Sequence, residues 1–249
     1  MKKATTLAAL ALCASLWLTL AVVPASAAPV HARWAEEIAL NVSPDLNAYA
    51  GDYPSDPPYI HWLGVQNANQ YENYTKCASF VTLVLQQAYG WDKNYFYQWL
   101  GHESPFATHY HQAIKDGTGF LVIQKITDIQ SGDIIAIDYP DDAKDTGHVM
   151  IAAGAPTLTL RGATALMYTI EVIDSTKTPH DSTDTRCLVH GCPEATQDTG
   201  AGLGVFRLYA NAAGTIVGYT WSPEEPAYYD QTSPEDERRD LKVGRLQLR

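Results

Sequence analysis

The spacing of apolar residues predicts helices in the middle of the chain and strands after them. Between residues 75 and 89 the apolar positions repeat at helical spacing, with Thr75 as a good N-cap and Gly90 as a good stop. A second helix is predicted from Ser104, which is followed by Pro105 at the first helical position, to about Lys115. The apolar stripe of the first helix consists of Phe80, Val81, Val84, Leu85 and Ala88.

After Gly119 the pattern changes to short runs of β-branched and aromatic residues, which are typical of strands. Helices followed by strands indicate an α+β fold. The expected strands cover residues 120–126, 133–138, 148–153, 165–174, 203–210 and 215–221.

The first 27 residues have the three parts of a secretory signal peptide. Lys2 and Lys3 supply positive charge, residues 7–23 are almost wholly apolar, and Ala25-Ser26-Ala27 is a small-residue cleavage site. The alternative is a membrane anchor, but the cleavage site favours a peptide that is removed. We therefore expect a periplasmic or secreted protein with no stable membrane span after cleavage.

The remaining residues divide into three parts. Residues 28–60 are rich in Pro and Tyr and are interpreted as an N-terminal extension packed on the domain. Residues 61–222 hold the predicted helices and strands and form the expected domain. Residues 223–249 are polar and charged, which is typical of a solvated tail, although Leu241, Val243 and Leu246 could add a last strand.

Composition and charge narrow the functional classes. The chain has 249 residues, 46% of them hydrophobic, and a formal net charge of −11. The apolar fraction is too high for a disordered acidic protein. Phosphate binding needs clustered Lys and Arg, which the chain lacks, so a nucleic-acid partner is not expected. We expect a monomer without a cofactor.

The cysteines predict one disulfide and one unpaired thiol. Loss of the signal peptide removes Cys13, and Cys187 and Cys192 are five residues apart around Gly191, so they can pair in an oxidising compartment. Cys77 is then left over. Zinc binding by Cys187, His190 and Cys192 is the alternative for that loop. An exported location favours the disulfide, so no metal site is expected.

The position of Cys77 favours a nucleophile over a buried inert thiol. In the first turn of a helix, the dipole and the free N–H groups stabilise a thiolate, and Lys76 adds positive charge. The same N–H groups can bind a developing oxyanion. A side chain upstream of the cysteine would be the second donor, and Tyr71, Asn69 and Asn67 are candidates among which the sequence does not choose.

His148 and Asp174 are the expected base and orienting group. His148 begins an apolar strand directly after Gly147, so its ring can reach a cleft. If the next strand returns antiparallel about residue 161, Asp174 lies opposite His148 on the same face of the sheet, whereas Glu171 points to the other face. Cys77, His148 and Asp174 would then form a Cys–His–Asp triad.

Two motifs resemble the NlpC-type, papain-like cysteine peptidase and amidase superfamily. Tyr74-Thr-Lys-Cys77-Ala-Ser-Phe-Val81 looks like its nucleophile helix, and Ser131-Gly-Asp133 followed by Gly147-His148-Val149 looks like its next two strands. The resemblance covers about residues 62–222. It implies a papain-like fold, in which the nucleophile helix packs on a small antiparallel sheet. It also implies hydrolysis of peptide or amide bonds, often in cell-wall peptidoglycan, with Cys77 as nucleophile, His148 as base and Asp174 as the third member.

Two loops and two other functions complete the expectations. The long segment 175–202 is expected to rim the active site, and Gly200-Ala-Gly-Leu-Gly204 is interpreted as a flexible hinge. The alternative functions are a non-catalytic domain that binds glycan or peptide through its 15 Tyr and 6 Trp, and an amidase or acyltransferase that acts on another substrate.

Overall fold

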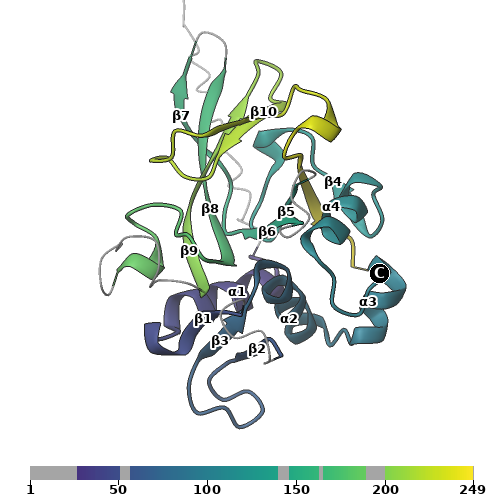
Figure 1. The fold of residues 1–249 in the computed structure, drawn as a ribbon, viewed down its shortest axis with the longest axis vertical. Helices are drawn as coiled ribbons and strands as arrows, with labels where there is room; N and C mark the ends of the chain where they lie inside the picture. The colour runs from purple at the N-terminus through teal and green to yellow at the C-terminus, as the bar shows by residue number, and fades with distance from the viewer. Residues whose placement is uncertain (1–26, 51–56, 140–145, 163–164, 189–199, 249) are drawn as a thin grey trace, which may run out of the picture.

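The computed structural model describes residues 27–50, 57–139, 146–162, 165–188 and 200–248 (Figure 1). The predicted signal peptide lies outside these residues, apart from Ala27. Among the described residues, no helix has the length and apolar character to cross a membrane.

One large antiparallel sheet dominates the structure. Its strands run in the order β11-β10-β9-β8-β6-β5-β12-β4, and β7 pairs with β8 outside this path, which gives nine strands. Figure 1 shows β8 and β9 as the long pair along the vertical axis, and their register joins eleven residue pairs from Leu166↔Ala210 to Thr176↔Gly200. The strands are β4 (Phe120–Val122), β5 (Ile134–Asp138), β6 (Gly147–Ala152), β7 (Thr157–Arg161), β8 (Leu166–Thr176), β9 (Gly200–Ala210), β10 (Ile216–Thr220), β11 (Tyr228–Asp230) and β12 (Leu241–Leu246).

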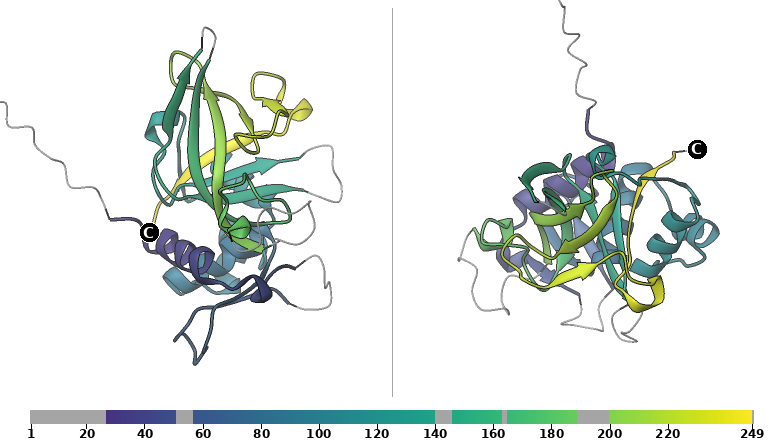
Figure 2. Two further views of the ribbon diagram at one scale, coloured as in Figure 1. Left: turned by 90° about the vertical axis from the view of Figure 1, so that its left-hand side faces the viewer. Right: turned by 90° about the horizontal axis from the view of Figure 1, so that it is seen from above.

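The expected fold, an α+β papain-like helix on a small antiparallel sheet, is wrong. The sheet is large, and the molecule is mostly β. The sequence pattern missed β7, which is largely exposed, and β11, which lies in a polar, charged stretch. The last strand that Leu241, Val243 and Leu246 could add is β12. The views in Figure 2 show the sheet extending well beyond the helices.

The helices and a second, small sheet gather at one end of the large sheet (Figure 1). The small sheet has the order β1-β3-β2, with β1 parallel to β3. Its strands are β1 (Asn47–Tyr49), β2 (Tyr59–His61) and β3 (Glu72–Thr75). The helices are α1 (Val30–Asn41), α2 (Cys77–Tyr89), α3 (Lys93–Leu100) and α4 (Ala107–Lys115), and short 3-10 segments cover Pro44–Leu46, Ile126–Asp128, Thr185–Cys187 and Glu235–Glu237.

Helix α2 begins one residue later than its N-cap pattern predicts. Thr75 ends β3, and Lys76 is the N-cap, so Cys77 is the first helical residue. The helix ends at Gly90 as expected, because that glycine adopts a left-handed conformation with φ of 70°. Helix α4 likewise begins at Ala107, past the predicted cap at Ser104.

Both ends of the chain join the core. The expected N-terminal extension contains α1, which packs on α2, and its buried His31 ring contacts the Tyr89 hydroxyl at 2.6 Å and the Gly132 carbonyl oxygen at 2.7 Å. At the other end, β12 lies between β5 and β4 inside the sheet. Its Arg245 binds both carboxylate oxygens of buried Asp133 at 2.8 and 2.9 Å.

The two faces of the large sheet bury separate apolar clusters. Ile134, Val149, Ile151 and Ile173 pack against the helices. The alternate residues of the same strands, including Ile135, Met150 and Val172, pack with Phe206 and Tyr219. Because side chains alternate along a strand, residues two apart share a face. His148 and Asp174 therefore belong to the second face, at the end of the sheet where α2 begins.

Candidate active site

The structure brings Cys77, His148 and Asp174 together. Strand β3 leads directly into α2, and the buried Ser175 hydroxyl donates a 2.8 Å hydrogen bond to the Thr75 carbonyl oxygen. This bond ties the start of α2 to the end of β8, next to Asp174. The Cys77 side chain is 8% exposed and lies 4.0 Å from the Gly147 carbonyl oxygen, at the beginning of β6.

His148 and Asp174 are diagonal rather than directly opposite. Strands β6 and β8 pair with Ile151 opposite Ile173, and extending this register puts Thr176 opposite His148 and Met150 opposite Asp174. The expected hairpin about residue 161 is replaced by β7, which pairs with the first half of β8. The shift is two residues, so the parity is unchanged and both side chains remain on one face. Glu171, of the opposite parity, is exposed.

The His148 ring bridges the other two residues. Its Nε2 lies 2.6 Å from Oδ2 of Asp174, and the charge of the Cys77 side chain acts on the same ring. Since Asp174 occupies Nε2, the ring nitrogen left to exchange a proton with the thiol is Nδ1. An orienting carboxylate on one ring nitrogen and a nucleophile on the other is the arrangement of a catalytic triad.

The charges around His148 favour its protonated form. Burial alone would lower the pKa of the ring, but the negative charge of the Cys77 thiolate and the hydrogen bond to Asp174 outweigh burial. Together they raise the pKa of His148 to about 10. A ring that favours its cationic form beside a cysteine is the arrangement that suits a cysteine nucleophile.

Asp174 is the centre of a buried charge network that the sequence did not indicate. Its Oδ1 accepts a 2.9 Å hydrogen bond from Nη1 of Arg186, and its Oδ2 lies 3.2 Å from Nε2 of His180. Arg186 also binds Asp184 through Nε at 2.8 Å and Nη2 at 2.7 Å. Burial would raise the pKa of Asp174, but the charges of Arg186 and His180 outweigh it and hold the pKa well below its usual range. Asp174 is therefore a permanent anion behind His148.

Two glycines of β9, Gly202 and Gly204, make room for this network. A Cβ on Gly202 would lie 2.5 Å from Nε of Arg186, and one on Gly204 would lie 2.2 Å from Oδ2 of Asp184. A Cβ on Gly200 would meet the Asn47 side chain at 2.2 Å. The glycine-rich stretch predicted as a hinge is instead the first half of a strand. Glycines at a spacing of two are the sequence signal that side chains pack closely on one face there.

Trp221 and His180 hold the imidazole of His148 from the side. The Trp221 ring meets the His148 ring edge-on, with centroids 4.9 Å apart, and stacks on the His180 ring at 4.3 Å. His180 in turn contacts the Trp221 carbonyl oxygen at 2.8 Å through Nδ1. Trp221 follows β10 directly, so a strand far along the chain helps to position the His148 ring.

A cavity of about 430 Å³ opens beside Cys77 and His148. This volume is within the range of small-molecule sites, roughly 300–1,000 Å³. Thr176, Lys177 and Thr178 contribute to its wall, so the described first part of segment 175–202 does rim the site. The aromatic lining consists of Tyr49, Tyr139, Tyr219, Trp221 and Tyr229.

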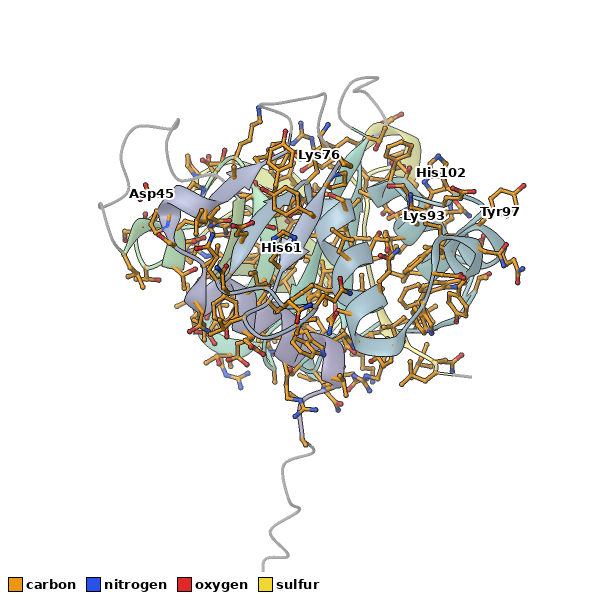
Figure 3. All side chains as sticks on the ribbon, turned by 90° about the horizontal axis from the view of Figure 1, so that it is seen from below. Asp45, His61, Lys76, Lys93, Tyr97 and His102 are labelled. Carbon is orange, nitrogen blue, oxygen red and sulfur yellow. The ribbon has the colours of Figure 1, made fainter. Side chains whose placement is uncertain are left out.

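The three expected oxyanion side chains lie elsewhere. Asn67 and Asn69 line a different cavity of about 680 Å³, together with His61, which is labelled in Figure 3. The Tyr71 hydroxyl donates a 2.9 Å hydrogen bond to Oε1 of Glu37 on α1. None of the three is among the described residues that line the cavity at Cys77. The Cys77 backbone N–H, at the N-terminus of α2 beside Lys76 (Figure 3), is the donor that this geometry supports.

The expected disulfide lies only partly within the described residues. Cys187 is buried, in the 3-10 segment that also carries Arg186. Cys192 and His190 lie outside the described residues, so the Cys187–Cys192 pairing stays a prediction. Cys77 is a free thiol, as the cysteine count predicts.

Comparison with known proteins finds a viral relative. The chain is 29% identical over 233 residues to an uncharacterized protein of Acanthamoeba polyphaga mimivirus, and the match covers 88% of this chain and 97% of the relative. No protein-family model matches the chain. No solved structure matches it. The functional argument therefore depends on the geometry of the site.

Proposed function

We propose that this protein is a cysteine hydrolase that cleaves a peptide or amide bond through a thioester. The observation that carries the proposal is the buried His148 ring, which lies 2.6 Å from the Asp174 carboxylate and shares a cavity with Cys77, whose charge acts on the ring. A buried inert cysteine has no use for a histidine and an arginine-held carboxylate aligned on its thiol.

The reaction uses each residue in turn. The Cys77 thiolate attacks the carbonyl carbon, and the Cys77 N–H stabilises the resulting oxyanion. The intermediate collapses to a thioester and expels the amine, which takes a proton from the His148 imidazolium. Water then attacks the thioester carbonyl and gives a proton to neutral His148. Release of the carboxylic acid restores the thiolate and the imidazolium, and Asp174 keeps its charge throughout.

The proposed substrate is a peptide of cell-wall peptidoglycan. This choice follows from the predicted signal peptide and from the NlpC-type motifs around Cys77 and His148, which keep the same order along the chain. The different fold does not weaken the chemistry, because the same catalytic constellation occurs on unrelated folds.

The aromatic cavity favours one other candidate, a non-catalytic domain that binds glycan or peptide. Tyr139, Tyr219, Trp221 and Tyr229 offer flat faces of the kind that such ligands use. The two functions differ in their need for the thiol. A binding domain keeps its affinity and its biological role when Cys77 is replaced by Ser, whereas the hydrolase loses turnover.

Mass spectrometry of peptidoglycan fragments after incubation with the protein tests the proposal. We expect a mass gain of one water at a defined peptide or amide bond with the native protein and none with Cys77→Ala. Inclusion of an amine acceptor separates hydrolysis from acyl transfer, because transfer gives a product with the mass of the amine. Fragments cut equally by Cys77→Ala would contradict the nucleophile assignment.

A further inference from the structure

One wall of the cavity at Cys77 carries a cation, Arg239, that the proposed reaction does not use. Arg239 lies just before β12, and its side chain is exposed to the cavity and solvent. Cys77 and His148 line the same cavity, so a small ligand seated there can reach both the thiol and the guanidinium.

Aromatic rings fix the guanidinium in place. Its Cζ lies 4.0 Å from the ring centroid of Tyr139 and 5.2 Å from that of Tyr229. The Tyr229 ring stacks on Tyr219 at 4.9 Å, and Tyr219 stacks on Phe206 at 5.4 Å, so the support extends into the core. The Arg239 backbone is held as well, since Nε2 of Gln231 donates a 2.8 Å hydrogen bond to its carbonyl oxygen.

Arg239 and its neighbour Arg238 differ in their acidic partners. Within the described part of the chain, no carboxylate lies at ion-pair distance from its guanidinium, and Nη1 makes only a long 3.4 Å contact with the Tyr229 hydroxyl. The neighbouring Arg238, by contrast, binds Asp240 at 2.5 Å.

We propose that Arg239 is a specificity residue that binds a carboxylate of the amide substrate beside the scissile bond. A guanidinium held over tyrosine rings still has N–H donors for a ligand, and its planar fork matches a carboxylate with two parallel hydrogen bonds. The cation–π contacts hold the side chain without consuming its donors. This inference rests on the proposed hydrolase, since it assigns the substrate class of the same cavity as acidic peptides.

Iodoacetate and iodoacetamide test the inference without a known substrate. Both alkylate a thiolate with loss of iodide and have nearly the same size, but only iodoacetate carries a carboxylate. The measured quantity is the rate of alkylation at Cys77 by iodoacetate divided by the rate by iodoacetamide, obtained by mass spectrometry of the Cys77 peptide. This ratio reports whether the cavity attracts the carboxylate. We expect this ratio to fall about tenfold in Arg239→Gln, the size of one lost charge-assisted hydrogen bond at an exposed site.

Two further variants and added salt serve as controls for this alkylation ratio. Arg33→Gln removes the same charge from exposed α1 and should leave the ratio unchanged. Arg239→Lys keeps the charge but loses the planar fork, so its ratio should be intermediate. Added salt should lower the native ratio, because screening weakens an exposed ionic contact.

The outcomes separate this inference from the proposed function. Rapid alkylation of Cys77 with the same ratio in the native protein, Arg239→Gln and Arg33→Gln would overturn the carboxylate site and leave the hydrolase standing. Equal loss of the ratio in Arg33→Gln would also overturn it, because the effect would then be one of net charge. Slow alkylation by both reagents, with a ratio that still depends on Arg239, would support the carboxylate site and contradict the nucleophile.

Discussion

Arg186 and His148 bind opposite oxygens of Asp174. Nη1 of Arg186 donates to Oδ1 at 2.9 Å, whereas Nε2 of His148 lies 2.6 Å from Oδ2. The carboxylate is thereby fixed in position and charge at once, so the His148 ring is oriented by a buried ion pair. In the proposed hydrolase, catalysis and folding therefore both depend on Asp174, and substitutions around it should affect both.

Loss of Arg186 should destabilise the fold strongly. Arg186→Ala leaves the carboxylates of Asp174 and Asp184 buried without their cation, which typically costs about 3–5 kcal/mol. Urea denaturation measures this free energy of unfolding. Lys115→Ala is the matched control, because it breaks an exposed ion pair with Glu235 and should cost less than about 1 kcal/mol. Equal effects of the two substitutions would contradict the buried network.

The close packing of Arg186 on Gly202 of β9 gives a second prediction about stability. Gly202→Ala places a methyl group 2.5 Å from Nε of Arg186, and such overpacking costs about 1–3 kcal/mol. Gly154→Ala is the control, because a Cβ there meets nothing within 4 Å. The melting temperatures of the two variants should differ clearly, with only Gly202→Ala below the native protein. A Gly202→Ala protein that melts like the native one would show that Arg186 lies elsewhere.

Asp174→Asn should reduce both activity and stability. The neutral amide holds the His148 ring less firmly, so turnover should fall less than in Cys77→Ala or His148→Ala. The pKa of Asp174 is lowered on folding, so its contribution to stability is present above the usual aspartate range. That contribution disappears as the pH falls through the lowered pKa. The stability gap between native protein and Asp174→Asn should therefore be widest near neutral pH and shrink in acid, as pH-dependent unfolding would show.

The amino-acid pattern predicted which face of the sheet a residue lies on better than it predicted what packs against the sheet. It indicated that His148 and Asp174 share a sheet face, and this holds although the register is shifted by two, because strand parity repeats every two residues. The burial of Arg186 was not predictable, since it follows from the long-range packing of a loop on β9. Strand β12 was uncertain because its apolar residues follow a charged run, and only its pairing between β5 and β4 shows its role.

The expected oxyanion side chains lie away from Cys77, and long-range packing is again the reason. Tyr71 precedes Cys77 by six residues, but β3 lies between the two, and the Tyr71 hydroxyl donates to Glu37 on α1. Sequence distance from the nucleophile says little once a strand intervenes. By contrast, the alternation of Gly200, Gly202 and Gly204 was a readable sign of close packing, and it was misinterpreted as a hinge.

The pH dependence of turnover should reflect the raised pKa of His148. The leaving amine needs a proton from the imidazolium, so kcat/KM should stay level through neutral pH and decline only as the pH rises through about 10. An ordinary histidine would lose its proton near pH 6.5. The apparent value belongs to the coupled pair of Cys77 and His148. A decline centred near pH 6.5 would contradict a thiolate beside the ring.

The most direct test of the account is the rate at which iodoacetamide alkylates Cys77 at about pH 6 in the native protein and in His148→Ala. The imidazolium of His148 stabilises the thiolate, so the native thiol should react at least about tenfold faster, the effect of roughly one pKa unit. The difference should shrink as the pH rises and the free thiol ionises by itself. If the two proteins react at equal rates at this pH, His148 does not activate Cys77, and the proposed triad is wrong.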